Sequence, residues 1–444
     1  MLDLKTLRLK FMKAKINAEW DTLRRVAVHS PGIEMYFGLL DPFASLYERS
    51  FSMEKAIKEH EILRYILKHE FKINIISLKE KLLNLADESN YIREKLMDLA
   101  NEKISYTGDI YEVKYAKYES EKNRDILDSN YYFNSLLLNP TVKLESGVGT
   151  RMIQLHVTEN EPLSNLYFMR DQQAVTDKGI IISRMSKPQR MREPEITKFL
   201  WDSLNIPVKC EIKNPGTFEG GDFIPMDEFA LIGMGDRTNK AGVEQILKNG
   251  IGYSEVAIVH QPTHTLLPSG KTDYMMNMHL DTYFNVASDG VVVGCEILLK
   301  NAEVEIYQKE GLGEYSKINK HTNLHDYIIS KGFEIIDITT LEYLSYASNF
   351  LCVKNGTIIS VEVDRLVKGV INNLKKKAFV DPETYGDLLK QVKKDYTLLQ
   401  SEGQFFPHKK EIYQHDIDAY PLNLINLTGG YGGAHCMTCA LKRG

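Results

Sequence analysis

The sequence of 444 residues contains four short apolar hairpin patterns of one design. In each, an apolar run reaches a turn rich in Asp, Asn or Gly, and a second apolar run follows directly. Asp-Gly and Asn-Gly are strong hairpin signals because both residues tolerate a positive φ. The turns lie at Asp177–Gly179, Asp227–Glu228, Asp289–Gly290 and Asn355–Gly356, inside apolar runs at 173–183, 223–233, 283–294 and 350–360.

The hairpins recur about 50 to 70 residues apart, and helical stretches such as Glu193–Ser203 and Lys240–Asn249 fill the intervals. A further strand is predicted at Arg25–His29, near the start of the chain. Any α/β protein contains hairpins, so coincidence is the alternative explanation. Four hairpins of one design favour a repeated supersecondary unit and therefore an α/β fold.

Polar residues stand immediately before the first strand of each hairpin. If the units pack around a common axis, these positions converge on one place, as in sites built on rigid scaffolds. Taken singly, each has an ordinary explanation, such as a turn or an ion pair. The four groups are Arg170-Asp171, Glu219-Gly-Gly-Asp222, His279-Leu-Asp281 and Ser348-Asn349.

Residues 79–145 interrupt the repeat, because they contain no hairpin signal and are highly charged. Their apolar residues recur at intervals of three, four or seven, which predicts helices. We expect an α-helical insertion at 79–145 within a discontinuous catalytic domain formed by residues 1–78 and 146–444. A helical module that binds a partner is the alternative. The periodic residues are Leu82, Leu85, Ile92, Leu96 and Leu99.

Cys436 lies in a glycine-rich segment, Gly429-Gly-Tyr-Gly-Gly-Ala-His-Cys-Met-Thr-Cys439. Glycines let the backbone approach a ligand closely and hold a side chain at a tight turn. A cysteine there predicts a nucleophile, with His279 as its acid–base partner and Glu219 orienting the imidazole.

Two other chemistries fit parts of this pattern. Cys436 and Cys439 have the spacing of a redox pair or of half a zinc site, but the sequence has no second CxxC. A structural zinc site needs two further ligands. His279 and Asp281 resemble a metal-binding pair, yet no third ligand stands at short spacing. We therefore predict no metal.

Four motifs in this order resemble the arginine deiminase family of the guanidine-modifying pentein superfamily. The resemblance extends from about Trp20 to the C-terminus and includes a helical insertion in the same place. It implies a five-bladed α/β propeller of ββαβ units, in which N- and C-terminal strands complete the fifth blade. The motifs are Asn165-Leu-Tyr-Phe-Met-Arg-Asp171, Glu219-Gly-Gly-Asp222, Met278-His-Leu-Asp-Thr282 and His435-Cys-Met-Thr-Cys439.

The resemblance also implies a mechanism. Asp171 and Asp281 would bind a guanidinium through charge-assisted hydrogen bonds, which fixes its central carbon. Cys436 would attack that carbon, and His279, held by Glu219, would protonate the leaving nitrogen and then activate water. No metal or organic cofactor is required.

Substrate selection rests on other residues that the resemblance assigns. Arg190 and Arg237 match positions that bind the α-carboxylate of free arginine, with Asn165 and Phe168 lining the pocket. An ordinary solvated ion pair is the alternative for Arg190. The chain departs from the family at Tyr431, where bacterial arginine deiminases have an arginine on a mobile loop over the substrate.

Net charge and cysteine content limit which binding partners and which cellular compartment are expected. The formal net charge is -5, so nucleic acid and anionic membranes are not expected partners. The Met-Leu-Asp-Leu-Lys start lacks the regions of a signal peptide, and five scattered cysteines favour a reducing compartment. We expect a cytoplasmic protein, and a homo-oligomer is compatible with the sequence.

The predicted function is arginine deiminase, a hydrolase that converts L-arginine to L-citrulline and ammonia. Within the same superfamily, another guanidine hydrolase, an arginine dihydrolase that proceeds to ornithine, or an amidinotransferase remains open. From a different class, a catalytically inactive pentein would serve as a binding module.

Overall fold

The repeated unit is present in the computed structural model, which describes residues 13–146, 153–311 and 313–444. In the first unit, β6 (Gln173–Thr176) pairs antiparallel with β7 (Gly179–Ile182). Helix α7 (Glu193–Ser203) follows, and β8 (Val208–Glu211) then pairs parallel with β7. The predicted hairpin and the predicted helix at Glu193–Ser203 are both confirmed.

The same ββαβ order recurs in the next three units. The predicted hairpins at 223–233, 283–294 and 350–360 and the helix at Lys240–Asn249 are confirmed. The elements are β9 (Phe223–Met226), β10 (Phe229–Met234), α8 (Lys240–Asn249) and β11 (Glu255–His260); β12 (Phe284–Ser288), β13 (Val291–Gly294), α9 (Glu296–Asn301), α10 (Leu324–Ser330) and β16 (Glu334–Asp337); and β17 (Leu351–Lys354), β18 (Thr357–Val361), α12 (Val363–Val380), α13 (Pro382–Glu402), α14 (Lys410–Gln414) and β19 (Asp418–Leu422).

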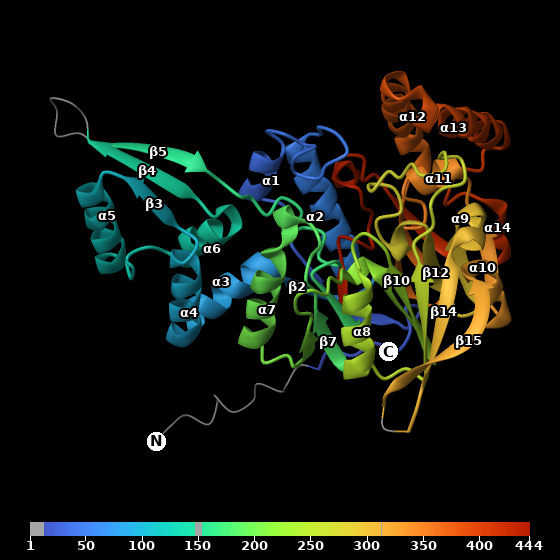
Figure 1. Cartoon of the computed structure of the whole chain (residues 1–444), viewed down its shortest axis with the longest axis horizontal. Helices are drawn as coiled ribbons and strands as arrows, with labels where there is room; N and C mark the ends of the chain where they lie inside the picture. Colours follow the sequence, from blue (N-terminus) through green and yellow to red (C-terminus); the bar gives the residue numbers. More distant parts are fainter. Residues whose placement is uncertain (1–12, 147–152, 312) are drawn as a thin grey trace.

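The fifth unit is assembled from both ends of the described chain. β20 (Cys439–Arg443) pairs antiparallel with β1 (Leu23–Val28), and β2 (Asn74–Ser77) pairs parallel with β1 after helix α2 (Met53–His69). The strand predicted at Arg25–His29 thus belongs to β1. The five units confirm the predicted α/β propeller (Figure 1).

The segment predicted as a helical insertion is a mixed α/β module. It contains the predicted helices, but also a three-stranded sheet of order β3-β4-β5 that extends past residue 145 (Figure 1). Helical periodicity alone does not reveal these short strands. The elements are α3 (Leu78–Glu88), α4 (Asn90–Asn101), β3 (Ser105–Gly108), α5 (Ile110–Lys122), α6 (Ser129–Leu138), β4 (Thr141–Ser146) and β5 (Ile153–Glu159).

Two further additions were not predicted. The hairpin β14 (Glu303–Lys309) and β15 (Tyr315–Asn323) extends the sheet of the second unit. Helices α12 and α13 form a hairpin inside the fourth unit, at the upper right of Figure 1. Short helices α1 (Ile33–Gly38) and α11 (Thr340–Leu344) lie in connections between units.

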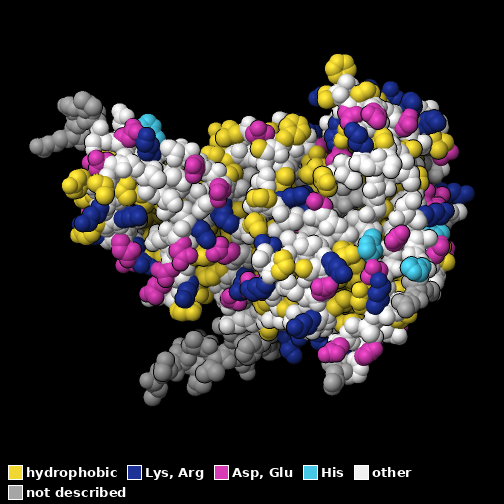
Figure 2. Space-filling model, viewed as in Figure 1, with side chains coloured by type: hydrophobic (Ala, Val, Ile, Leu, Met, Phe, Trp, Pro, Cys, Tyr) yellow, Lys and Arg dark blue, Asp and Glu magenta, His cyan; other side chains and the backbone are white. Residues whose placement is uncertain are grey.

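The central strands are buried on both faces, which fits their nearly continuous apolar runs. On the face shown in Figure 2, acidic and basic side chains are interspersed. Within the described ranges, the helices are all too short or too polar to cross a membrane. The Met1–Lys5 segment used above lies outside the described residues.

Candidate active site

Asp171 and His279, which precede the first strands of two units, line a small cavity of about 330 Å³. Eight of the ten predicted site residues line it, and Glu219 and Asp281 are the two that do not. Both of these are fully buried. The eight are Asn165, Phe168, Asp171, Arg190, Arg237, His279, Tyr431 and Cys436.

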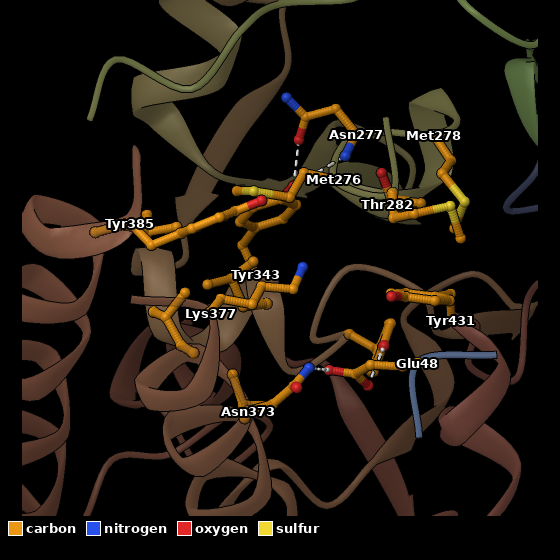
Figure 3. Close-up of a pocket in the computed structure, with 16 residues that line it drawn as sticks. Glu48, Met276, Asn277, Met278, Thr282, Tyr343, Asn373, Lys377, Tyr385 and Tyr431 are labelled. Atoms are coloured by element: carbon orange, nitrogen blue, oxygen red, sulfur yellow. Dashed lines mark hydrogen bonds between the residues drawn. The ribbon is translucent and has the colours of Figure 1, made fainter. Parts of the chain in front are cut away.

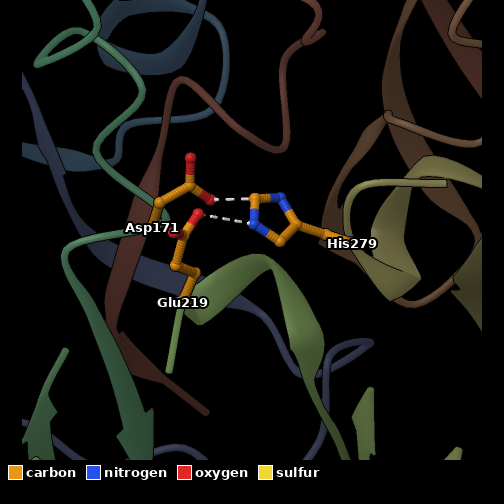
Figure 4. Close-up of side chains that lie close together, drawn as sticks. All are labelled: Asp171, Glu219 and His279. Carbon is orange, nitrogen blue, oxygen red and sulfur yellow. Dashed lines mark hydrogen bonds and ion pairs between the residues drawn. The ribbon is translucent and has the colours of Figure 1, made fainter. Parts of the chain in front are cut away.

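His279 lies between two carboxylates (Figure 4). Its Nε2 is 2.9 Å from Glu219 Oε2, and its Nδ1 is 3.7 Å from Asp171 Oδ1. Burial alone would lower the pKa of this imidazole, but Asp171 and the hydrogen bond to Glu219 outweigh it and raise the pKa to about 9. At neutral pH the ring is therefore protonated, and its Nε2–H donates to Glu219 while Nδ1 forms an ion pair with Asp171.

Glu219 is held from several sides, so it fixes the imidazole in one orientation. Its Oε1 accepts a hydrogen bond from the backbone N–H of Ser186 at 2.9 Å. Although burial opposes ionisation, Arg237 and His279 hold the pKa of Glu219 well below its usual range. The adjacent Gly221 is needed for space, since a Cβ there would lie 2.9 Å from His279 Cγ.

Cys436 is buried at the start of the turn that leads into β20. Its Sγ is 3.6 Å from Asp281 Oδ2, and its backbone N–H donates to Asn349 Oδ1 at 3.1 Å. Burial and the charges of Asp281 and Asp171 raise the pKa of the Cys436 thiol well above its usual value. Gly432 is required because a Cβ there would come within 2.6 Å of Phe168 and 2.8 Å of Cys436 Cβ.

Asp171 and Asp281 each use one carboxylate oxygen and leave the other without a partner. Asp171 Oδ2 accepts from Arg190 at 2.7 Å, and Asp281 Oδ2 is 2.7 Å from His435 Nδ1. The Oδ1 atoms of both are buried and have no hydrogen-bond partner among the described residues. A buried carboxylate oxygen without a hydrogen bond is costly, so both atoms retain the capacity to accept one from a bound donor.

The two predicted carboxylate-binding arginines differ in their surroundings. Arg190 is buried, donates to Asp171, and donates from Nε and Nη2 to Glu193 at 2.9 to 3.1 Å. Its ion pairs are therefore buried rather than solvated. Arg237 is also buried, but its Nη2 faces the sulfur atoms of Met275 and Met278, and its Nε has no hydrogen-bond partner among the described residues.

The remaining pocket residues form its walls. Asn165 donates from its side-chain Nδ2 to the backbone carbonyl of Ser45 at 2.7 Å. The backbone carbonyl of Asn165 accepts from Arg190 Nη2 at 3.5 Å. Tyr431 borders both this cavity and a second one of about 630 Å³. Figure 3 shows Tyr431 and Met278 on one side of the second cavity, opposite Tyr385.

Sequence reasoning gave no role to two residues that hold the site together. His435 orients Asp281 through Nδ1, and Asn349 contacts the Cys436 turn. Both signals were visible, because His435 directly precedes the cysteine and Asn349 precedes the fourth hairpin. The cavity residues Leu46 and Met275 lie in irregular segments that carry no comparable pattern, whereas Met278 opens the motif Met278-His-Leu-Asp-Thr282.

The CxxC pair is reduced in the structure. All five cysteines lie in the described part of the chain and none forms a disulfide. Cys439 is buried in β20, where burial raises the pKa of its thiol to about 11. A buried thiol of high pKa is a poor partner for disulfide exchange.

One cluster has the composition of a metal site. Single ligand atoms of Asp171, Glu219 and His279 lie within 4.8 Å of one another (Figure 4). However, Arg237 Nη1 is 3.7 Å and Arg190 Nη1 is 3.9 Å from Glu219 Oε2. Two guanidinium charges and a protonated imidazole repel a divalent cation at this place.

Comparison with known proteins gives the family. The arginine deiminase family model matches residues 44–443, nearly the whole chain. The chain belongs to the arginine deiminase family. This confirms the resemblance seen in the four sequence motifs.

Relatives of this arginine deiminase family member are distant. Arginine deiminase of Halobacterium salinarum is 26% identical over 526 aligned positions, covering 97% of each chain. Arginine deiminase of Staphylococcus aureus strain MRSA252 is 25% identical, covering 78% of this chain and 88% of the relative. Membership of this family makes the chain a hydrolase that acts on guanidino C–N bonds.

Two solved structures are similar to the chain, and the first of them supports the fold. The N-terminal domain of ArgZ, covalently bound to a reaction intermediate, superposes with a TM-score of 0.50 at 13% identity, covering 94% of this chain and 98% of that chain. Dimethylarginine dimethylaminohydrolase of Pseudomonas aeruginosa gives a TM-score of 0.47 at 14% identity, covering 94% and 99%.

Proposed function

We propose that this protein is an arginine deiminase that hydrolyses L-arginine to L-citrulline and ammonia through a covalent Cys436 intermediate. The observation that carries the proposal is a pair of buried aspartates near the cysteine, each with one oxygen that lacks a hydrogen-bond partner among the described residues. Asp281 Oδ2 is 3.6 Å from Cys436 Sγ, and Asp171 lines the same cavity as Cys436. A guanidinium is planar, cationic and rich in N–H donors, so it satisfies both oxygens at once.

Substrate binding also activates the nucleophile. The high pKa of the free Cys436 thiol comes from burial and from the charges of Asp281 and Asp171. A guanidinium between these carboxylates offsets their negative charge and so favours the thiolate. Ionisation of the cysteine is therefore coupled to the arrival of a cation.

The first half of the reaction forms an S–C bond and releases ammonia. The Cys436 thiolate attacks the guanidinium carbon, and protonated His279 gives its proton to the leaving amino group. The C–N bond then breaks and an S-alkylthiouronium remains on the sulfur. Glu219 keeps the imidazole in place throughout, since its hydrogen bond to Nε2 does not involve the substrate.

The second half uses the same imidazole as a base. Neutral His279 takes a proton from water, the hydroxide adds to the thiouronium carbon, and the C–S bond breaks. The products are citrulline and the regenerated cysteine. No step requires a metal or an organic cofactor.

Arginine is preferred over other guanidines because of Arg237. Arg237 lines the cavity, and its Nε has no hydrogen-bond partner among the described residues although Asp236 Oδ2 lies 3.8 Å away, so a donor remains for the α-carboxylate of a free amino acid. Arg190 supplies a second positive charge, although Asp171 and Glu193 already occupy most of its donors. The distant arginine deiminases of Halobacterium and Staphylococcus support the same substrate.

The test is a product assay with arginine, agmatine and a methylated arginine, with Cys436→Ser as the inactive control. We expect one citrulline and one ammonia per arginine, unchanged by a chelator. Ornithine with two ammonia molecules would make the protein a dihydrolase. Faster agmatine turnover would overturn the arginine assignment, and no turnover of any guanidine would favour the binding module.

A further inference from the structure

Asn349 is the fourth unit's counterpart of the residues that form the site. Asp171, Glu219, Asp281 and Cys436 precede the first strands of the other units, and Asn349 stands before β17 in the same way. It is fully buried. The proposed chemistry so far gives it no part.

Its side chain joins two segments that have to stay in register. Oδ1 accepts hydrogen bonds from the backbone N–H groups of Gly433 at 2.8 Å and of Cys436 at 3.1 Å. Nδ2 donates to the backbone carbonyl of Asp281 at 3.1 Å. The amide therefore links the turn that carries the nucleophile to the segment that carries a guanidinium-binding carboxylate.

The backbone of Asn349 adds a third link to the same turn. Its carbonyl accepts from the N–H of His435 at 3.1 Å, one residue before the cysteine. The Asn349 amide also acts on the sulfur, because it lowers the pKa of Cys436 against the larger raising effect of burial and the two aspartates. A neutral donor at this position thus opposes the surrounding negative charge.

We propose that Asn349 is a positioning residue, which places the Cys436 sulfur against the guanidinium carbon by tying the 433–436 turn to the Asp281 segment. This inference rests on the proposed function for the identity of the electrophile. Misplacement of a reacting atom by about 1 Å costs roughly 100-fold in rate, so loss of these bonds acts mainly on kcat.

Two substitutions separate positioning from folding. Asn349→Asp keeps the acceptor oxygen and the shape, but loses the donor to Asp281 and adds a negative charge beside the sulfur. Asn349→Ala removes both the acceptor oxygen and the donor group of the side chain. The matched control is Ser348→Ala, since Ser348 is equally buried in the same segment and its hydroxyl bonds to Thr282 O at 2.6 Å, away from the cysteine turn.

The first readout needs no arginine. The rate of Cys436 alkylation by iodoacetamide is followed against pH by peptide mass spectrometry, with thermal melting to check folding. We expect Asn349→Asp to move the midpoint of this profile upward by about one pH unit. The Ser348→Ala profile should match the wild type.

The second readout is arginine turnover. We expect kcat to fall about 100-fold in both Asn349 variants, with KM changed less than about threefold. Variants that melt like Ser348→Ala and keep wild-type alkylation and kcat would overturn the inference. A shifted alkylation profile in a protein whose wild type does not turn over arginine would instead refute the proposed function and leave the positioning role intact.

Discussion

The two ends of the candidate site are built differently. The guanidine end, which is proposed to bind the guanidinium, uses residues in short segments directly before β6, β9, β12 and β20, and each has a defined partner. The carboxylate end, which is proposed to bind the α-carboxylate, uses Arg237, Tyr431 and the irregular segment around Met275. In this proposal the chemistry depends on the repeat, whereas selection of the substrate depends on longer connections. Changes at the first end should stop the reaction, and changes at the second should alter what is accepted.

The largest effect is expected from the covalent pair. Cys436→Ala and His279→Ala should each lower kcat by about 10⁴-fold or more, because both act in the same step. Circular dichroism should show an unchanged fold. Cys439→Ser is the control, and its kcat should stay within about twofold of wild type. A loss of kcat in Cys439→Ser as large as in Cys436→Ala would support a redox or metal role of the CxxC pair instead.

The carboxylates come next. Asp171→Asn and Asp281→Asn should each lower kcat/KM for arginine by about 100-fold. In each variant the amide places an NH₂ donor against an N–H donor of the guanidinium, where the carboxylate had an acceptor. The charged hydrogen bond that is lost is worth about 1.5–3 kcal/mol. Steady-state kinetics on both variants measure this. Near-normal kinetics in both would place the guanidinium elsewhere.

The other end of the site should respond selectively. Arg237→Ala should lower kcat/KM for arginine by about 100-fold and lower kcat/KM for agmatine, which lacks the α-carboxylate, much less. Arg190→Ala should instead destabilise the fold by about 3–5 kcal/mol, since it removes the positive charge paired with the buried Glu193 and leaves only the hydrogen bond from Gln172. Denaturant unfolding and kinetics on both substrates separate the two. Equal losses on both substrates in Arg237→Ala would contradict the assignment.

The pH profile sharpens the comparison at the guanidine end. With the pKa of His279 raised to about 9, the ring keeps its proton at neutral pH and loses it as the pH rises through that value. We therefore expect the rate to fall on the alkaline side near pH 9. Glu219→Gln removes a group that raises the pKa, so the alkaline limb should move to lower pH. A limb that stays in place would mean another group supplies the proton.

Tyr431 should give the smallest effect. It borders the cavity, and in place of a third positive charge it offers one hydroxyl and a ring. Tyr431→Ala should raise KM for arginine about threefold to tenfold and change kcat less. Tyr431→Phe is the control for the hydroxyl. A fall in kcat larger than the rise in KM would give Tyr431 a part in the chemistry.

Local sequence was sufficient for the repeat, because each hairpin and the helices at Glu193–Ser203 and Lys240–Asn249 depend on near neighbours. It was also sufficient to predict that Asp171, Glu219 and His279 converge, since they hold equivalent positions of a repeat, whereas Cys436 was identified from its glycine-rich segment and the family motif.

Local sequence was not sufficient to predict contacts between residues that are distant in sequence. The bond between Arg190 and Asp171 depends on tertiary packing, as does the link from Asn349 to Cys436. The sheet β3-β4-β5 was missed because its strands are short and lie among helices. Assignment of residues 79–145 as a separate domain, the cytoplasmic location and a homo-oligomer remain predictions.

The most direct test of the central claim is mass spectrometry of the protein quenched in acid during turnover of arginine. We predict an adduct equal in mass to arginine less ammonia on the peptide that contains Cys436, absent from Cys436→Ser and formed with isotope-labelled arginine at the shifted mass. Citrulline production by Cys436→Ser, or an adduct on another residue, would contradict the account.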